Sequence, residues 1–564
     1  MKTSKILVLV LAIALIVSSI GFAGAEDSSN LSEVGVYPIW TGDEPATITV
    51  LMAPSDYVTS HEENVYTQTL EELCNVNLDF EYLPATDPAD KLQIMVNTGE
   101  ELPDVICYSL SVATEKSYAE AGALLNLRDY YDAGLAYNVD KAVAEYPDWN
   151  LLTNITAADG SIYATPKIQK SPSNETKYKM WVNEGWLENL GLEVPTTTDE
   201  FYEMLKAFKE QDANGNGDAT DEIPFLTSTG WGGTATKYLT NAFVFEGDGD
   251  MFLLVDGHVS VSYIQDAWFD ACDYLKKLCD EGLLAKESFT YSNTDVYAIS
   301  GTDEDVLGCT TNSSLAYMGS ADDPYRLRFI CIDPLTGPEG VQYTAYAQSG
   351  TSGMWHVTTF AENPELCFRV GDAQFTEDFF LLGRFGVEGE NWMTAEDYTA
   401  ANPGTEVAAR YGAMGYEAKY VFYNDIFGTP NALNWYDQMP YFSGEVECEG
   451  GYVSKAADGT TITLENNATC RQETASGSYQ LCKPGTDVYV PTLAYTDEEL
   501  EEISEAMSTI KTYVNEQRTN YIIGEASDLA DPDKFIENLK SSFDLDRILE
   551  IADAAYQRQY ASAN

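Results

Sequence analysis

The chain has 564 residues, more than one ordinary domain holds, and 44% of them are hydrophobic, enough for folded cores. Its 31 Lys and Arg are outnumbered by 91 Asp and Glu, which gives a net charge of -60. This charge argues against nucleic acid and anionic lipid as partners, because both present phosphates that bind basic side chains. We therefore expect two domains, or one two-lobed unit, that bind neutral or cationic small molecules.

The N-terminus has the pattern of an export signal. MKTSK supplies two lysines, an apolar run extends from Ile6 to Phe22, and Ala23-Gly24-Ala25 matches a cleavage site. The alternative is a membrane anchor, because the run is about long enough to span a bilayer. We predict a signal peptide at 1–25 and a flexible leader at 26–45. No cysteine stands near the cleavage site for lipid attachment, so we expect an exported, extracytoplasmic protein that is periplasmic, cell-surface or secreted.

The first part of the mature chain alternates between strand and helix patterns. A β-rich run at 46–54 is followed by a helix-then-strand pattern at 65–84 and by another at 91–108, where Pro103 and Asp104 precede the apolar run VICY. This rhythm predicts an α/β lobe with a largely parallel sheet. A turn and a strand are then expected at 159–169.

The middle of the chain predicts helices that begin at clear signals. KMWVN reads as a strand that runs directly into a helix. Thr198 is a plausible N-cap for the next helix, which places Phe201, Leu205 and Phe208 on one face. A further long helix is expected at 265–282. Residues 430–495 are turn-rich and predict β or irregular structure, whereas the C-terminus returns to helix with a capping signal at Thr496.

The ten cysteines show no disulfide framework typical of a small secreted domain. Cys272 and Cys279 lie on one predicted helix but two turns apart, too far to form a bond. Cys470 and Cys482 flank a polar segment and either pair or remain buried free thiols.

The stretch DANGNGDATDEIPF, at 212–225, begins like a calcium loop. Alternating Asp and Asn place oxygens on one side of a tight turn, and Gly215 and Gly217 permit the positive φ that such a turn needs. Position twelve is Ile223 instead of the Glu that closes an EF-hand, and Asp221 and Glu222 supply carboxylates earlier. The alternative is an acidic surface turn without metal. We predict a structural Ca²⁺ site with these ligands: Asp212, Asn214, Asn216, Asp218, Asp221 and Glu222.

Conventional catalytic motifs are scarce. The sequence has three His and no HExxH, CxxC, GxSxG or P-loop pattern. With so many acids, any carboxylate pair for glycoside hydrolysis can be found, so such pairs carry no information. The aromatic content of 12% is high, and Trp and Tyr faces stack on sugar rings. Core packing is the alternative for each Trp. Trp231 in TGWGGT and Trp392 in GVEGENW are the better cleft candidates, because Gly-rich loops expose the side chains they carry.

Several of these stretches together resemble bacterial extracellular solute-binding proteins of ABC importers, in particular the oligosaccharide-binding branch related to the LplA-type lipoproteins and alginate-binding proteins. The stretches are 181–209, the loop at 212–225, FGVEGENW at 385–392, and the helical segments 510–529 and 548–560. The resemblance covers most of residues 46–564 in order, so it indicates the family without naming the ligand.

The resemblance implies an α/β, type II periplasmic-binding-protein-like fold, with two lobes joined by hinge strands and the ligand in the cleft between them. The predicted division is an N-terminal lobe at 46–165, a C-terminal lobe at 166–325 that carries the Ca²⁺ loop 212–222, a return to the N-terminal lobe at 326–385, and the C-terminal lobe again at 386–564 with an insertion at 430–495. Within the loop, Thr220 or Asp221 fills the later ligand position.

By this resemblance the protein is not an enzyme and has no catalytic residues. It binds a carbohydrate, expected to be an oligosaccharide, and delivers it to ABC permease subunits, acting as a monomer without nucleic acid. The alternatives are a secreted carbohydrate-active hydrolase and a glycan-binding surface or sensor module without a transport role. The predicted ligand-binding residues are Tyr163, Trp181, Asn183, Trp231, Trp355, Glu388 and Trp392.

Overall fold

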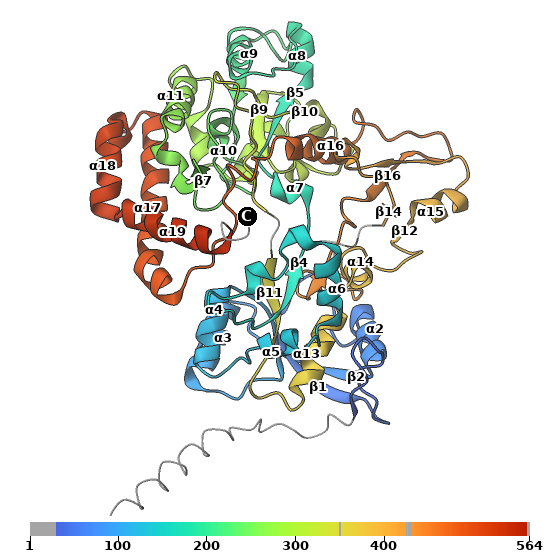
Figure 1. Cartoon of the computed structure of the whole chain (residues 1–564). Helices are drawn as coiled ribbons and strands as arrows, with labels where there is room; N and C mark the ends of the chain where they lie inside the picture. Colours follow the sequence, from blue (N-terminus) through green and yellow to red (C-terminus); the bar gives the residue numbers. More distant parts are fainter. Residues whose placement is uncertain (1–29, 349–350, 425, 427–429, 561–564) are drawn as a thin grey trace, which may run out of the picture.

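The computed structural model describes residues 30–348, 351–424, 426 and 430–560. The predicted signal peptide at 1–25 and the start of the leader lie outside this range. Figure 1 shows two halves, which we call the lower and upper lobes, with a smaller sheet and a helical segment on opposite sides. The two-lobed α/β architecture expected from the sequence is confirmed.

The lower lobe is built on a six-stranded sheet in the order β15-β4-β11-β3-β1-β2. Strand β1 pairs in parallel with β2 and β3, whereas β11 runs antiparallel to β3 and β4. The strand bounds are β1 Ala46–Met52, β2 Val76–Tyr82, β3 Val105–Leu110, β4 Thr165–Ile168, β11 Thr351–Val357 and β15 Tyr441–Phe442. The helices of this lobe are α2 Val65–Cys74, α3 Pro88–Thr98, α4 Val112–Glu120, α5 Arg128–Asp132, α6 Tyr137–Glu145, α13 Pro364–Ala373 and α14 Glu377–Phe385.

The upper lobe is built on a four-stranded sheet in the order β10-β5-β9-β6, with the hairpin β7-β8 beside it. Its strands are β5 Lys179–Asn183, β6 Ile223–Phe225, β7 Phe252–Val255, β8 His258–Val261, β9 Leu307–Asn312 and β10 Phe329–Ile332. Its helices are α7 Pro172–Glu175, α8 Glu184–Leu190, α9 Thr198–Glu210, α10 Ala235–Thr240, α11 Asp266–Asp280, α12 Asn293–Ser300 and α16 Ala468–Leu481. All five residues of β5 are buried, as expected for a strand between two neighbours.

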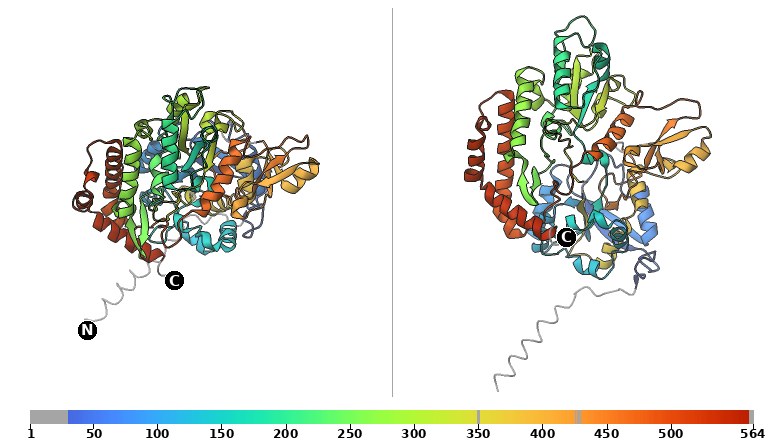
Figure 2. Two further views of the ribbon diagram at one scale, coloured as in Figure 1. Left: turned by 90° about the horizontal axis from the view of Figure 1, so that it is seen from above. Right: turned by 45° about the horizontal axis from the view of Figure 1, so that its top comes forward.

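A third sheet and a helical segment flank the two lobes (Figure 2). The third sheet has the order β12-β14-β16-β13, with bounds β12 Trp392–Thr394, β13 Glu406–Ala409, β14 Tyr420–Phe422 and β16 Gly450–Lys455, and α15 Ala395–Ala401 lies against it. On the opposite side, α17 Asp497–Ile523, α18 Pro532–Phe543 and α19 Leu545–Gln559 pack together, and α17 contacts α11. The capping box predicted at Thr496 is present, with Glu499 as its partner.

Three local expectations need correction. Helix α9 is capped by Thr197, one residue before the predicted Thr198, because the side chain of Thr197 accepts the Glu200 amide in a capping box. Residues 468–481, expected to be β or irregular, form the helix α16. This helix also overturns the possible Cys470–Cys482 pair: twelve residues of helix separate the two cysteines by about 18 Å, and all ten cysteines are free thiols.

The chain passes between the lobes more than once. It rises from β4 to β5, returns from β10 to β11, and reaches the upper lobe again at α16 after β15. The predicted lobe boundaries at 165, 325 and 385 stay a prediction. Strand β10 belongs to the upper-lobe sheet, beside β5, and strand β15 belongs to the lower-lobe sheet, beside β4. Residues as late as Val446 contribute to the hydrophobic core of the lower lobe.

Candidate functional site

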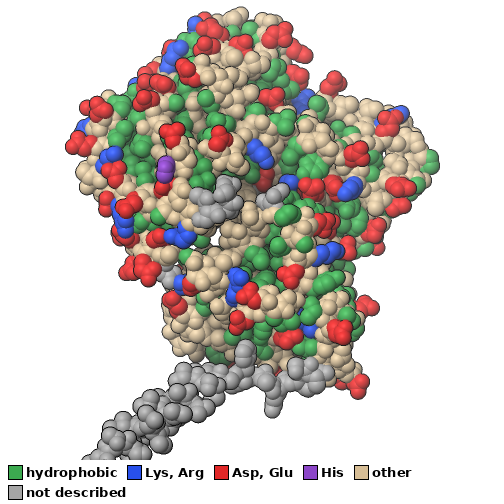
Figure 3. Space-filling view, in the orientation of Figure 1, with side chains coloured by type: hydrophobic (Ala, Val, Ile, Leu, Met, Phe, Trp, Pro, Cys, Tyr) green, Lys and Arg blue, Asp and Glu red, His purple; other side chains and the backbone are tan. Residues whose placement is uncertain are grey.

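Four cavities form a row between the lobes, and neighbouring cavities share lining residues. We label them A to D in the order in which they share lining residues. Cavity A (about 340 Å³) shares Gln169 and Ser171 with cavity B (about 340 Å³). Cavity B shares Asp248 with cavity C (about 390 Å³), which shares Asn154 and Thr492 with cavity D (about 510 Å³). Figure 3 shows the surface hollowed where the two lobes meet. We call this row the cleft.

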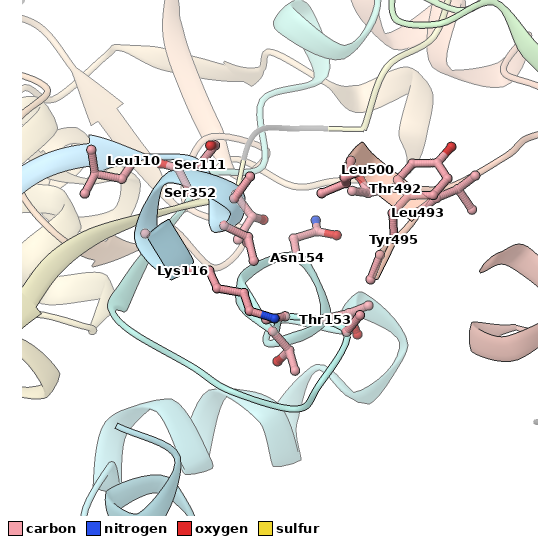
Figure 4. Close-up of a pocket in the computed structure, with 18 of the residues that line it drawn as sticks. Leu110, Ser111, Lys116, Thr153, Asn154, Ser352, Thr492, Leu493, Tyr495 and Leu500 are labelled. Carbon is pink, nitrogen blue, oxygen red and sulfur yellow. The ribbon is translucent and has the colours of Figure 1, made fainter. Parts of the chain in front are cut away.

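Cavity D lies at one end of the cleft and is shown in Figure 4. Leu110, Ser111 and Lys116 approach it from the lower lobe, at the end of β3 and on α4. The segment that contains Leu493 and Tyr495 faces them from the start of the helical segment. The cavity is therefore lined by both halves of the molecule, as a site between two lobes requires.

Trp231 presents an aromatic face in cavity B. Its side chain is 59% exposed, and the loop around it is fixed by Thr229 N–H donating to the Tyr291 carbonyl at 2.8 Å. Gly232 has φ +71° there, and a Cβ at this position would stand 2.3 Å from the Ser313 nitrogen, so the turn requires glycine. The Lys177 ammonium lies 3.9 Å from the centroid of the Trp231 ring, within the range of a cation–π contact.

Lys177 also joins Trp231 to an acid of the cleft. Its Nζ lies 2.5 Å from Asp248 Oδ2, and the Tyr178 hydroxyl donates to Asp248 Oδ1. Burial raises the pKa of Asp248, but the hydrogen bonds from Lys177 and Tyr178 outweigh it and lower the pKa overall. An ionised carboxylate, an ammonium and an indole face thus meet at one point of the cleft. Such a group can bind the hydroxyls and the apolar face of a sugar ring.

The loop that carries Asp248 is anchored two residues earlier by a buried cluster. Glu246 accepts hydrogen bonds from Arg518 Nη1, at 2.9 Å to each carboxylate oxygen, and from Trp268 Nε1 at 2.7 Å. Lys237 Nζ lies 2.9 Å from Glu246 Oε1. Glu246 is fully buried, which raises its pKa, but Arg518 and Lys237 together lower the pKa to about 2. The cluster joins α10, α11 and α17 behind the cleft.

Of the predicted ligand-binding residues, Trp231 alone lines a cavity of the cleft among the residues described. Tyr163, Trp181, Trp355 and Trp392 are buried in hydrophobic clusters, and the indoles of the three tryptophans donate to backbone carbonyls within those clusters. Asn183 is also buried, where it caps α8. Glu388 is exposed on a turn outside the four cavities. Five of these six side chains are buried and present little surface to a ligand in this structure, and the exposed Glu388 lies outside the four cavities. Their role in ligand binding stays a prediction.

Most of the cleft residues gave no local signal in the sequence. Lys167, on β4, lies 2.5 Å from Asp437, 270 positions later in the chain. Arg410 at the end of β13 lies 2.9 Å from Glu473 on α16. Such pairs form only when segments far apart in the chain come together in the folded protein. The one available signal was the Gly-rich context of Trp231.

The loop at 212–222 lies in the upper lobe between α9 and β6, away from the cleft. Its turns are closed by side-chain oxygens: Asp212 accepts Gly217 N–H at 2.9 Å, and Asn216 accepts Asp218 N–H at 2.7 Å. Gly215 and Gly217 have φ of +75° and +94°, as the sequence predicted. The loop geometry thus gathers side-chain oxygens at one place.

Two oxygens of this loop are buried without a hydrogen-bond partner: Asp212 Oδ1 and Glu222 Oε2. Burial raises the pKa of Glu222. Buried carboxylate oxygens without donors are costly unless a cation binds them. Among the described residues no three His, Cys, Asp or Glu side chains are already gathered as metal ligands. A calcium loop also uses Asn side-chain and backbone oxygens, so the two orphaned carboxylate oxygens are the stronger indication. The residues fit an oxygen-liganded cation.

Comparison with known proteins shows which family the chain resembles. Residues 60–298 match the model for "Bacterial extracellular solute-binding protein". The chain is also 29% identical, over 404 residues, to the fructooligosaccharide ABC transporter substrate-binding protein FusA of Streptococcus pneumoniae, which covers 69% of this chain and 71% of FusA. The chain is thus similar to the bacterial extracellular solute-binding proteins over residues 60–298 and to FusA over 404 residues. The Bacillus subtilis polygalacturonan/rhamnogalacturonan-binding protein YtcQ is a further relative, 24% identical over 357 residues, or 60% of this chain and 65% of that one.

Solved structures of solute-binding proteins share the fold. FusA in complex with kestose superposes with a TM-score of 0.68 at 23% identity, covering 92% of this chain and 100% of FusA. An EF-hand mutant of FusA gives the same values. The alginate-binding protein AlgQ2, solved without calcium ion, gives a TM-score of 0.60 at 21% identity and covers 92% of this chain and 99% of its own. The expected two-lobed fold of this family is confirmed.

Among the residues that the structure describes, no helix combines the length and apolar character needed to cross a membrane.

Proposed function

We propose that this protein is the extracytoplasmic receptor of an ABC importer, that it binds an oligosaccharide in the cleft, and that it delivers this ligand to membrane permease subunits. The observation that carries the proposal is the row of four cavities between the lobes, with Trp231 exposed in it beside Lys177 and Asp248. The cleft offers aromatic and hydrogen-bonding groups to a ligand that spans several sugar rings. The relative FusA, named for fructooligosaccharide, supports this class of ligand.

Binding without turnover is part of the proposal. The receptor role needs a ligand enclosed by two lobes and no chemical step, and Trp231, Lys177 and Asp248 can supply recognition without one. We further propose that the protein acts as a monomer, that residues 1–25 direct its export, and that it functions outside the cytoplasm.

The test is a panel of oligosaccharides followed by melting temperature and by product analysis of the same samples. A ligand that binds only the folded protein raises its melting temperature in proportion to its concentration. We expect at least one oligosaccharide to do so and to be recovered intact. Cleavage of the sugar would favour the hydrolase alternative, and the absence of any shift across the panel would contradict glycan binding.

We also propose a structural Ca²⁺ ion in the loop at 212–222. The donors would be Asp212, Asn214, Asn216, Asp218, Asp221 and Glu222, and the orphaned oxygens of Asp212 and Glu222 carry the proposal. Asp221 is favoured over Thr220 for the later position. The two Asp221 oxygens lie 3.4 and 2.7 Å from the side-chain amides of Asn214 and Asn216, within the proposed donor set. The Thr220 hydroxyl instead donates its hydrogen to Asp218 at 2.6 Å. The EF-hand of FusA and the calcium ion named for AlgQ2 support the same assignment.

The ion would supply positive charge that links the end of α9 to β6. We expect a calcium chelator to lower the melting temperature of the wild type and to have little effect on Asp212→Asn. Asp458→Asn is the matched control, because Asp458 closes an exposed turn by accepting Thr460 N–H at 2.9 Å but has no orphaned oxygen. Equal responses of wild type and Asp212→Asn to chelator would show that the loop holds no ion.

A further inference from the structure

The cleft differs from the rest of the molecule in its charge. The whole chain has about three acidic residues for each basic one, and acidic side chains are scattered over the visible face (Figure 3). The four cavities are lined by five basic side chains, Lys116, Lys167, Lys177, Arg384 and Arg410. They are lined by equally many acids, Asp248, Asp250, Asp437, Glu447 and Glu473. The cleft is therefore electrically balanced in a polyanionic protein.

The balance is local, because the charges are joined in pairs. In cavity B, Lys177 lies 2.5 Å from Asp248, and Lys167 lies 2.5 Å from Asp437 across the boundary with cavity A. The two lysines are 13% and 15% exposed. Their partners Asp248 and Asp437 are 25% and 50% exposed, so salt screens the Lys177–Asp248 pair less than the Lys167–Asp437 pair.

The remaining basic side chains of the cleft are paired in the same way. Arg410 lies 2.9 Å from Glu473, and Lys116 lies 2.9 Å from Asp159. Arg384 lies 3.9 Å from Glu447, whose Oε1 also accepts Gln169 Nε2 at 2.6 Å. Every basic residue that lines the four cavities, among the residues described, thus has a carboxylate beside it.

We propose that the cleft selects uncharged, hydroxyl-rich oligosaccharides and rejects uronate oligosaccharides. The inference rests on the proposed function of the cleft as a glycan site and names the class of glycan. A sugar hydroxyl can donate a hydrogen bond to a carboxylate and accept one from an ammonium. Each ion pair therefore offers a sugar hydroxyl both an acceptor and a donor. A uronate brings a carboxylate of its own, and each cation of the cleft that it could approach already lies beside an acid that repels it.

The first experiment compares ligands that match in length and differ in charge. Neutral trisaccharides (kestose, maltotriose and xylotriose) and trigalacturonate are titrated into the full mature chain by calorimetry, at low and at moderate salt. We expect at least one neutral trisaccharide to bind at least tenfold more tightly than trigalacturonate. Tighter or equal binding of trigalacturonate would overturn the selectivity and leave glycan binding standing. Binding of neither class would contradict glycan binding itself.

The second experiment removes the acid from a pair while keeping its shape. Asp248→Asn and Asp437→Asn each leave a lysine of cavity B without its carboxylate. We expect both variants to bind the neutral trisaccharide less tightly and trigalacturonate more tightly, so that the ratio of the two affinities moves by at least tenfold toward the uronate. A structural role alone would weaken both ligands together, and that result would contradict the proposal.

Asp280→Asn is the matched control for these variants. It removes the acid of an ion pair with Lys276, at 2.9 Å on the exposed face of α11 and outside the four cavities. The ratio of neutral to uronate affinity should stay at the wild-type value in this variant. A shift as large as that of Asp248→Asn would show that total protein charge, and not pairing within the cleft, sets the selectivity.

Discussion

Glu246 and Asp248 stand two residues apart in one loop and carry the same functional group in opposite surroundings. Glu246 is wholly buried and is held by Arg518, Lys237 and an indole, whereas the side chain of Asp248 is 25% exposed and lines the cleft. The buried acid fixes the loop to three helices, and the exposed acid faces the space where a ligand would lie. The comparison teaches that burial, and not residue type, separates structural ion pairs from those available for recognition.

The largest effect should follow from removing a cationic partner of the buried acid, Glu246. Arg518→Ala leaves the Glu246 carboxylate buried with one cation removed, which we expect to lower the free energy of unfolding by about 3–5 kcal/mol. Chemical denaturation followed by tryptophan fluorescence measures it. The control is Lys511→Ala on the same helix, whose ammonium lies 3.9 Å from Asp250 in an exposed pair. Its change should stay within about 0.5 kcal/mol. Equal effects of the two variants would contradict the distinction.

The pH dependence of protein stability should also show the effect of burying Glu246. The folded pKa of Glu246 is about 2, below the value of about 4.3 for an unfolded Glu. A carboxyl group whose pKa is lower in the folded protein than in the unfolded chain stabilises the fold at pH values above the unfolded pKa. That stabilisation is lost as the pH falls from the unfolded pKa toward the folded one. We therefore expect the free energy of unfolding to fall steeply between about pH 4.5 and about pH 2.

Glu246→Gln isolates this contribution from those of the many other acids. The variant should be less stable than wild type at neutral pH, and its stability should fall less on acidification. Denaturation midpoints measured at a series of pH values test both statements. Parallel curves for wild type and variant across that window would mean that Glu246 does not titrate on unfolding.

Trp231→Ala should have an intermediate effect, on binding and not on folding. The indole is 59% exposed, so its removal should leave the melting temperature of the unliganded protein nearly unchanged. Loss of a stacking face should weaken oligosaccharide binding about tenfold, since such contacts contribute about 1 kcal/mol or more. Phe360→Ala, which removes an aromatic side chain that is 41% exposed and lies outside the cavities, serves as the control. Unchanged affinity in Trp231→Ala would remove Trp231 from the ligand site.

The contrast between Trp231 and Trp181 shows how far the sequence could predict this site. Trp231 stands between glycines that hold it on a surface loop, and local sequence indicated its exposure. Trp181 stands in β5, where the neighbouring strands β9 and β10 and the packing on both faces bury it. Strand and helix patterns along the chain predicted most of the architecture, because hydrophobic periodicity is a local property.

The cleft charges could not be predicted in this way. Lys177 and Asp248 pair across 71 positions, and Arg410 reaches Glu473 only because α16 packs beside the third sheet. A chain with 91 acids offers a partner for any lysine, so pairing could not be read from composition. The helix α16 was missed for a related reason: its low amphipathicity hides it, since both of its sides are buried.

The smallest effect on stability should come from a substitution of the more exposed acid, Asp248. Asp248→Asn keeps the size of the side chain and removes its charge. One oxygen can still accept from Lys177, and the amide NH2 then faces the Tyr178 hydroxyl, which can accept from it. Because Asp248 is partly solvated, we expect the free energy of unfolding of the unliganded protein to change by at most about 1 kcal/mol. The same denaturation experiment measures it beside Arg518→Ala. If Asp248→Asn destabilised the protein as much as Arg518→Ala, the loop from Glu246 to Asp248 would be one structural network, and Asp248 would have little freedom left to reorient toward a ligand.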